Sequence, residues 1–348
     1  MSKSFLTGKE DLYVRNDYPI PPINAEDYRL HMMIGGEIFV FSIEDLKTKY
    51  QQVSVDMLQA CAGNRRVSLP GTSGTPWEAA VGNVTYKGPR LLDVLSPILN
   101  EQEYEEEDLT EMHLYITGLD HSPSGTHYNT SIAWNKIPKD ALLALSMNGE
   151  DLTPDHGFPL RTVFPGLSGH YSIKFPDKMI LVHRDRIEMD ANFENSFSKD
   201  DAADLSLSRA QRSYVKYDQS DKIIGFADKL PVQSQILDVK ISQDFVTVKV
   251  YAHGEGGAEV ETLEVSYDGG ETWLRAECEK HESAADVKKW AWSFWSVKIP
   301  RKDIPKGCEM IISRARDKAG NVQPEKAVFN KRGLAANPWG RVETILFQ

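Results

Sequence analysis

One cysteine lies in a setting that suits metal binding. The run Met57-Leu58-Gln59-Ala60-Cys61-Ala62-Gly63-Asn64-Arg65-Arg66 places two arginines shortly after the thiol and two small residues beside it. Nearby cations favour the thiolate form, and a soft thiolate favours thiophilic or redox-active metals. Cys278 and Cys308 lie far along the chain, so the sequence lacks the paired spacing of a zinc site. From these residues alone a second interpretation stays open, in which Cys61 is a small buried hydrophobe and the arginines belong to a solvated turn.

Composition narrows the class of protein. The chain has 348 residues, enough for about two domains with cores that need no disulfides. Its three cysteines, an odd number, suggest a reducing compartment. We find no secretory signal and no apolar membrane span, so we expect a cytoplasmic protein without membrane association. The formal net charge of -11 argues against nucleic-acid binding, although clustered cations can still draw a small anion into a pocket.

The pattern of apolar residues divides the chain into an α+β half and a strand-rich half. Runs in the first half predict strands at 28–33, 37–41 and 53–58, and helices at 91–99 and 139–145. Strand-like runs in the second half occur at 244–251, 261–267, 290–297 and 310–315. Asp268-Gly269-Gly270 is a hairpin signal between two of them. We therefore expect an α+β domain over residues 1–222, with an exposed insertion or linker at 190–221, and a β-sandwich over residues 223–348.

A series of short motifs runs through the chain in a fixed order, from about Leu12 to Val342. The strings are Tyr13-Val14-Arg15-Asn16, the Cys61 window, Gly118-Leu119-Asp120, Asp155-His156-Gly157-Phe158-Pro159-Leu160-Arg161, Ser172-Ile173-Lys174, Leu230-Pro231-Val232-Gln233-Ser234 and Asn321-Val322-Gln323-Pro324. Their order and spacing resemble those of the sulfite oxidase family of molybdenum enzymes. The resemblance implies a molybdopterin-binding domain over residues 1–222 and an immunoglobulin-like β-sandwich over residues 223–348 that joins two chains into a homodimer.

The resemblance also implies a cofactor and the residues that hold it. The cofactor is molybdenum bonded by the two dithiolene sulfurs of a pyranopterin, with Cys61 as the ligand from the protein. The pyranopterin ends in a phosphate, and a buried phosphate needs charged or backbone donors. The implied cofactor-binding residues are Tyr13, Val14, Arg15, Asn16, Asp17, Cys61, Asp120, His156, Arg161, Ser172, Ile173 and Lys174.

The substrate implied by the resemblance is a small anion, sulfite above all. The guanidinium group of arginine has a fixed charge and a planar fork that suit an oxyanion. The residues implied on the substrate side are Arg15, Cys61, Arg66, Trp77 and, from the second half of the chain, Arg341.

Three departures from the family pattern bear on the substrate. Where the family commonly has Arg-Asn-His, this chain has Asp17 as the third residue, a carboxylate beside the anion site. Tyr171 stands where animal sulfite oxidases and nitrate reductases carry an arginine. The family's active-site tyrosine has no counterpart at 188–199, so the hydroxyl comes from another position such as Tyr171, or the chemistry proceeds without it.

The function implied by the resemblance is oxidation of sulfite to sulfate by oxygen-atom transfer. The sequence contains no Cys-x-x-Cys-His and no fused haem-binding segment, so we expect no haem and electron transfer to dioxygen or to a separate carrier. Two alternatives remain: a related reductase of nitrate or an S-oxide, and a catalytically silent cofactor-binding dimer.

Overall fold

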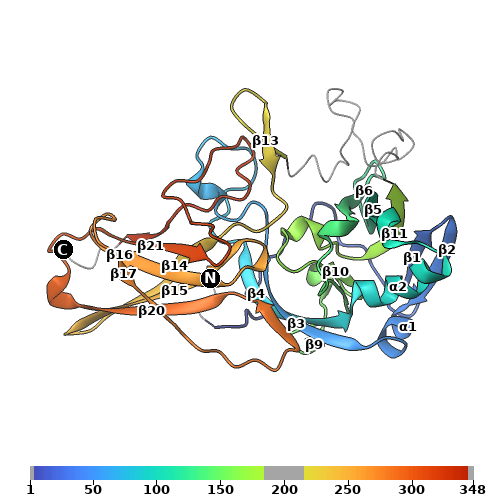
Figure 1. Ribbon diagram of the computed structural model, residues 1–348, viewed down its shortest axis with the longest axis horizontal. Helices are drawn as coiled ribbons and strands as arrows, with labels where there is room; N and C mark the ends of the chain where they lie inside the picture. Colours follow the sequence, from blue (N-terminus) through green and yellow to red (C-terminus); the bar gives the residue numbers. More distant parts are fainter. Residues whose placement is uncertain (1–3, 184–214, 344–348) are drawn as a thin grey trace.

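The computed structural model describes residues 4–183 and 215–343. Most strands of the N-terminal half, blue to green in Figure 1, lie on the right of the molecule, and the orange and red strands of the C-terminal half lie on the left. Strands dominate the described residues, and the α-helices are few and short. They are α1 (Ile43–Thr48), α2 (Leu91–Glu101) and α3 (Glu106–Leu109).

The largest core of the N-terminal half lies against a five-stranded sheet. Its strands, in order, are β2 (Glu37–Ser42), β1 (Arg29–Ile34), β11 (Pro176–His183), β5 (Met112–His121) and β6 (His127–Ala133). Strands β1 and β11 pair in parallel and the other neighbours are antiparallel. Helix α2 is amphipathic and buries Leu91, Val94, Leu95, Ile98 and Leu99 in this core. The predicted strands at 28–33 and 37–41 and the predicted helix at 91–99 are thus confirmed.

A second five-stranded sheet combines both halves of the chain. Its strands, in order, are β19 (Val287–Trp290), β3 (Gln52–Ala60), β4 (Val81–Pro89), β8 (Ser146–Met147) and β9 (Glu150–Asp151). Strand β19 belongs to the C-terminal half, yet it pairs in parallel with β3, with Val287 opposite Val55 and Trp290 opposite Met57. The local sequence of β3 predicts a strand, but it does not reveal that this strand pairs with one from the C-terminal half.

Two small antiparallel pairs complete the N-terminal half and its connection to the rest. One pairs β7 (Leu142–Ala144) with β10 (Arg161–Val163), and the other pairs β12 (Val215–Tyr217) with β13 (Ile223–Phe226). The predicted helix at 139–145 is wrong, because this run contains β7. A short run of buried apolar residues has no period that separates a strand from a helix. Most of the expected insertion at 190–221 lies outside the described residues, and its end forms the β12–β13 hairpin.

The C-terminal half is a sandwich of two four-stranded antiparallel sheets. One has the order β14 (Gln233–Ile241), β15 (Phe245–His253), β20 (Ser293–Pro300) and β18 (Glu277–Cys278). The other has the order β17 (Leu274–Arg275), β16 (Val260–Ser266), β21 (Met310–Asp317) and β22 (Gly340–Glu343). Inward side chains such as Val248, Leu263, Ile299 and Ile311 form one apolar core between them. Gly269 and Gly270 have positive φ angles of 78° and 97°, as the predicted hairpin requires.

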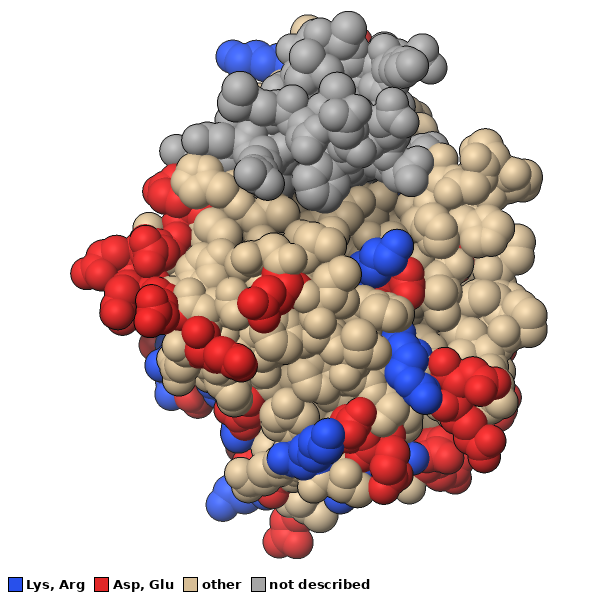
Figure 2. All heavy atoms as spheres, turned by 90° about the vertical axis from the view of Figure 1, so that its right-hand side faces the viewer, with Lys and Arg blue, Asp and Glu red and all other residues tan. Residues whose placement is uncertain are grey.

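Short 3₁₀ turns connect several of these elements. They cover Arg66–Ser68, Trp134–Lys136, Pro154–His156, Gly169–Tyr171, Glu255–Gly257 and Arg301–Asp303. None of the helices in the described residues combines the length and the apolar character that a membrane span requires. Figure 2 looks onto the right-hand end of Figure 1, where acidic side chains gather at the edge of a largely uncharged face. Part of the acidic excess of the sequence therefore lies on this outer surface.

Candidate cofactor and active site

Cys61 follows strand β3 directly. Its backbone N–H donates to the carbonyl of Ala80 at 3.0 Å, which continues the β3–β4 pairing by one residue. Its Sγ accepts a hydrogen bond from the N–H of Gly63 at 3.4 Å. Burial raises the pKa of the Cys61 thiol, while the Gly63 N–H, Arg66 and Arg15 act in the opposite direction. Because burial prevails, the surroundings alone do not ionise the thiol, and a bound metal would supply the missing positive charge.

The two arginines after Cys61 have different places in the structure. Arg65 is buried and donates to the carbonyls of Pro338 at 2.5 Å and Trp339 at 2.8 Å, so it ties this loop to the C-terminal half. The sequence suggested that both arginines favour the thiolate form, whereas the cations that act on the pKa of Cys61 are Arg66 and Arg15. A side chain at Gly63 would place its Cβ 2.4 Å from Nη2 of Arg66. The space beside the thiol that Gly63 leaves is therefore filled by Arg66.

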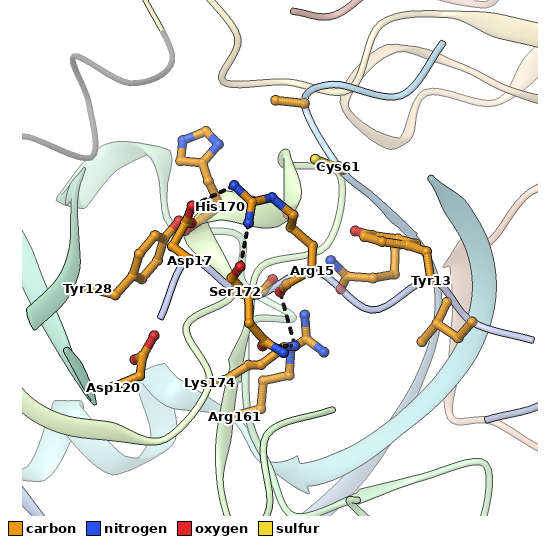
Figure 3. Close-up of a pocket in the computed structure, with 15 residues that line it drawn as sticks. Tyr13, Arg15, Asp17, Cys61, Asp120, Tyr128, Arg161, His170, Ser172 and Lys174 are labelled. Atoms are coloured by element: carbon orange, nitrogen blue, oxygen red, sulfur yellow. Dashed lines mark hydrogen bonds and ion pairs between the residues drawn. The ribbon is translucent and has the colours of Figure 1, made fainter. Parts of the chain in front are cut away.

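Cys61 lies in the wall of a polar pocket that opens beside β3. Most of the predicted cofactor residues point into it from several loops (Figure 3). We call it the Lys174 pocket, and its lining consists of Leu12, Tyr13, Arg15, Asn16, Asp17, Gln59, Cys61, Ala62, Asp120, Tyr128, Arg161, Gly169, His170, Ser172 and Lys174. The N-terminal segment before β1, strand β5 and the turn before β11 thus meet at the thiol.

Lys174 is the half-buried cation at the base of this pocket. Its Nζ donates to Oδ1 of Asn16 at 2.6 Å, to the carbonyl of Arg15 at 3.1 Å and to the carbonyl of Asp155. Burial and then the charge of Arg161 lower the pKa of Lys174 to about 7. The three acceptors are two backbone carbonyls and one side-chain amide, and all are uncharged. The ammonium therefore lacks a direct anionic partner among the described residues. An anionic ligand would supply that partner.

The lining of this pocket includes buried polar atoms that lack a hydrogen-bond partner among the described residues. Nε of Arg161 and Oε1 of Gln59 are examples. The guanidinium of Arg161 donates through Nη1 to the carbonyl of His156 at 3.2 Å and lies over the ring of Tyr86. An unsatisfied buried polar atom costs roughly 1–3 kcal/mol. Such a cost is expected where a polar ligand completes the site.

Asp120 faces the same pocket from strand β5. It is buried, and burial first and Asp17 second raise its pKa to about 6, against a smaller opposing effect of Lys174. A carboxyl group with this pKa can donate a hydrogen bond when it is protonated and accept one when it is not. Asp120 can therefore act as a hydrogen-bond donor or as an acceptor toward a ligand that carries amide-like groups.

Three of the predicted cofactor residues do not line the pocket. The side chain of Val14 is exposed, and that of Ile173 is packed in the main core. The N–H of Ile173 already donates to Oγ1 of Thr162 at 2.8 Å. His156 is buried below the pocket, where its Nε2 lies 3.0 Å from the carbonyl of Lys9. In this structure His156 supports Arg161 through its carbonyl and contributes no side chain to the cavity.

A second pocket adjoins the first and shares Arg15, Asp17, Cys61 and Tyr128 with it. We call it the Trp77 pocket, and its remaining lining consists of Tyr18, Gly63, Arg66, Ser73, Gly74, Thr75, Trp77, His127, Asn129, Arg332 and Leu334. Arg66 is held here by hydrogen bonds from Nε to the carbonyl of Arg332 at 2.8 Å and from Nη1 to that of Thr75 at 2.7 Å. The predicted substrate residues Arg15, Arg66 and Trp77 thus meet in one cavity beside the thiol.

The arginine that the C-terminal half contributes to the Trp77 pocket is Arg332. Arg341, which the sequence suggested, lies on β22 outside both pockets, and its Nη2 is 3.6 Å from Oε1 of Glu325. The expectation that a cation reaches the pocket from this half is met by a different residue. The only local signal for it is the cationic pair Lys331-Arg332 followed by Gly333, whose φ of 60° turns the chain beside Arg66.

Besides Tyr13, which the sequence predicted, a second tyrosine lines the wall around Cys61: Tyr128, which sequence reasoning missed. Tyr128 projects from β6 and lines both pockets, with its hydroxyl 3.5 Å from the carbonyl of His170. Tyr171, the position suggested by the sequence, is buried in the main core and donates to Oδ1 of Asp228 at 2.7 Å. Its hydroxyl is therefore turned away from the site. His170 is a further pocket residue that no motif indicated, and Gln59 is one that the Cys61 window contains without having been predicted as a site residue.

The residues around Cys61 fit a metal that brings its own chelate. Among the described residues, no group of three or more His, Cys, Asp or Glu side chains is placed to hold a metal ion. A metal on Cys61 would therefore need further ligands from a cofactor. The polar wall of the Lys174 pocket, with its cations and unsatisfied buried atoms, matches a large anionic organic group.

Family comparisons agree with this fit. Residues 17–188 match the oxidoreductase molybdopterin binding domain, and residues 227–346 match the Mo-co oxidoreductase dimerisation domain. The fold and site are thus those of a molybdopterin-dependent oxidoreductase. More narrowly, the chain belongs to the sulfite oxidase family, because it is 31% identical to the sulfite oxidase of Gallus gallus over 98% of this chain and 73% of that protein.

Other relatives and a solved structure extend the comparison. The chain is 32% identical to the mitochondrial sulfite oxidase of Homo sapiens over 99% of its own length, and it spans 63% of that protein. A nitrate reductase of Emericella nidulans is 30% identical over 98% of this chain and 41% of that protein. The crystal structure of the sulfane dehydrogenase SoxCD from Paracoccus pantotrophus matches with a TM-score of 0.73 and 21% identity, over 98% of this chain and 81% of that one. This likeness confirms the sulfite-oxidase-type fold.

Proposed function

We propose that this protein oxidises sulfite to sulfate at a molybdenum centre bound to Cys61. The observation that carries the proposal is the position of Cys61 between two pockets, one suited to a large polar cofactor and one lined by cations. A metal on this sulfur would face both cavities. The bound molybdenum cofactor supplies two-electron oxygen-atom transfer, and the polypeptide supplies binding, orientation and electrostatics.

In this proposal the Lys174 pocket holds the pyranopterin. Lys174 and Arg161 neutralise its phosphate, and Ser172 and Asn16 offer hydrogen bonds. Asp120 meets the amide-like groups of the ring system. Val14, His156 and Ile173, which do not line the pocket, act by shaping the chain around these residues.

The Trp77 pocket holds the substrate anion in the same proposal. Arg15, Arg66 and Arg332 place positive charge beside Cys61 from three separate segments. They hold the anion against its desolvation cost and stabilise the charge that shifts during the reaction. Tyr128 presents a hydroxyl at the boundary of the two pockets and orients the anion. Trp77 forms one wall and limits access of water.

The experiment that tests this function is metal analysis of the purified protein, followed by a substrate panel on the same sample. We expect molybdenum at close to one atom per chain and sulfite-dependent reduction of an artificial acceptor. Reduction of nitrate or an S-oxide by reduced viologen, without sulfite turnover, would instead establish the reductase. Molybdenum-loaded protein that turns over none of these compounds would establish the silent cofactor-binding dimer.

The reductase is the second candidate because of a specific observation. Asp17 lies in the substrate pocket and reduces its net positive charge, and nitrate carries less charge than the sulfite dianion. The 30% identity to a nitrate reductase supports the same reading. We rank it below sulfite oxidation because three arginines still line the cavity.

We further propose how the chain is organised in the cell. Residues 1–222 form the catalytic domain, and residues 223–348 form an immunoglobulin-like domain that joins two chains, as the match to a dimerisation domain supports. The protein acts in the cytoplasm and passes electrons to dioxygen or to an external carrier. Sulfite turnover under air, compared with turnover under argon with an added carrier, identifies the acceptor.

A further inference from the structure

Asp17 engages the arginine that is closest to it in the substrate pocket. Its Oδ1 accepts a hydrogen bond from Nη2 of Arg15 at 2.6 Å (Figure 3). The other terminal nitrogen of Arg15 donates to the carbonyl of Asn16. Two of the five N–H donors of this guanidinium group are therefore used by the chain itself. An oxyanion that takes these two donors competes with the carboxylate of Asp17.

The charge of Asp17 also acts on other groups around the cavity. Asp17 lines both pockets, together with Cys61 and Tyr128. Burial is the main cause of the raised pKa of both Cys61 and Asp120, and Asp17 raises each further. Cys61 follows β3 and Asp120 lies on β5, so the negative field of Asp17 reaches two separate segments of the site. Any anion bound beside Cys61 lies within the same field.

We propose that Asp17 is a specificity-determining residue that weakens the binding of dianions more than the binding of monoanions. This inference rests on the proposed function, since it concerns the anion pocket of the same site. Asp17 acts in two ways: it competes with the anion for Arg15, and it repels the bound anion. The repulsion is proportional to the charge of the anion, because Coulomb energy scales with the product of the two charges.

The test compares Asp17→Asn, Asp17→Ala and wild type as molybdenum-loaded protein. Asp17→Asn keeps an acceptor for Arg15 and removes only the charge. We expect it to tighten the binding of sulfate about tenfold and of nitrate about threefold. Nitrate carries half the charge of sulfate, so removal of Asp17 relieves half the repulsive energy, and its gain in affinity is the square root of the gain for sulfate. Titration calorimetry measures both anions without turnover. Equal gains for the two anions, or none, would overturn the proposal.

A positioning role for Asp17 makes the opposite prediction for Asp17→Ala. If the carboxylate served to hold Arg15 in place, the alanine variant would bind sulfate more weakly than wild type, and this result would also overturn the proposal. If Asp17 competes with the anion, the alanine variant binds sulfate more tightly. Glu259→Gln is the matched control, because Glu259 forms a 2.6 Å exposed ion pair with Lys318 outside both pockets. We expect no change in its affinity for either anion.

The kinetic arm separates this inference from the proposed function. With sulfite as substrate, Asp17→Asn should lower KM about tenfold while kcat changes less than about threefold, because a ground-state competitor is removed. A KM that stays at the wild-type value would count against Asp17 as the determinant. If no variant oxidises sulfite, the proposed function fails, and the sulfate and nitrate titrations still decide the role of Asp17.

Discussion

At the scale of single residues, Cys61 carries the metal assignment. Replacement of Cys61 by Ser exchanges a soft sulfur for a hard oxygen that is not ionised at neutral pH. We expect sulfite turnover to fall by at least about 100-fold, more than the loss of a supporting residue causes. The far-ultraviolet circular dichroism should stay unchanged. Steady-state kinetics gives the readout, and metal analysis of the same sample gives the activity per bound molybdenum.

The control for this variant is Cys278→Ser. Cys278 is exposed on β18, far from both pockets in the sequence and absent from their linings. It should keep its full turnover. Sulfite turnover by Cys61→Ser at the wild-type level would remove the basis of the proposed function.

Lys174 makes the pocket sensitive to pH. Its pKa of about 7 means that the charge is present below pH 7 and lost above it. A bound anion favours the protonated form, so the affinity of cofactor-free protein for sulfate, which stays a dianion over this range, should fall as the pH rises from 6 to 8, by up to about tenfold per unit above the pKa. Ionisation of Asp120 near pH 6 acts in the same direction. Titration calorimetry across this range measures the trend.

The comparison variant for the pH series is Lys174→Arg. Arginine stays charged over the whole range, so this variant should keep only the weaker dependence that Asp120 contributes. An equally steep fall in Lys174→Arg would show that Lys174 is not the titrating group.

At the scale of elements, strand β19 fastens the two halves together through Asp140. Trp290 at the end of β19 donates from Nε1 to Oδ2 of Asp140 at 2.9 Å, and Nζ of Lys289 lies 3.0 Å from the same oxygen. Asp140 is buried, and although burial alone would raise its pKa, these two partners lower it below the ordinary value. The carboxylate is thus ionised, and its Oδ2 contacts both Trp290 and Lys289.

Asp140→Ala should therefore destabilise the protein by about 1–3 kcal/mol, because it leaves the indole N–H without its acceptor. Urea unfolding should show a lower midpoint with an unchanged m-value. Glu259→Gln breaks an exposed ion pair and should cost less than about 1 kcal/mol. Equal losses in the two variants would contradict a special role for the Asp140 contact.

Elements could be predicted from the sequence where one local pattern decides them. The alternation of residues 28–33 and the helical period of 91–99 led to β1 and α2. Residues 139–145 led to a wrong helix, because the backbone partner of β7 is β10, about twenty residues further on. The pairing of β19 with β3 spans more than two hundred residues and leaves no local trace.

At the scale of the whole molecule, both halves of the chain build the Trp77 pocket, which we propose binds the substrate. Arg332 from the C-terminal half lines this cavity together with Arg15 and Trp77. Arg332→Gln should raise KM for sulfite by about tenfold to 100-fold, as expected when one partner of a charged contact is lost. Arg341→Gln removes the same charge outside the pocket and should behave like wild type in steady-state kinetics.

The motifs of the sequence led to more of the lining of the Lys174 pocket than of the Trp77 pocket. Arg161, Ser172 and Lys174 come from two motifs that lie close together along the chain, and all three line the Lys174 pocket. Arg332 and Tyr128 reach the cavity only through the packing of distant segments, which a local pattern cannot report.

The pairing of β19 with β3 has a consequence for attempts to separate the two halves. A chain cut after residue 222 would lose β19, and the backbone groups of Val55 and Met57 would then lie on an open, apolar sheet edge. Such an edge invites pairing with another copy. The isolated N-terminal half should self-associate, whatever its cofactor content, so the boundary between the halves is not a place where the protein divides cleanly.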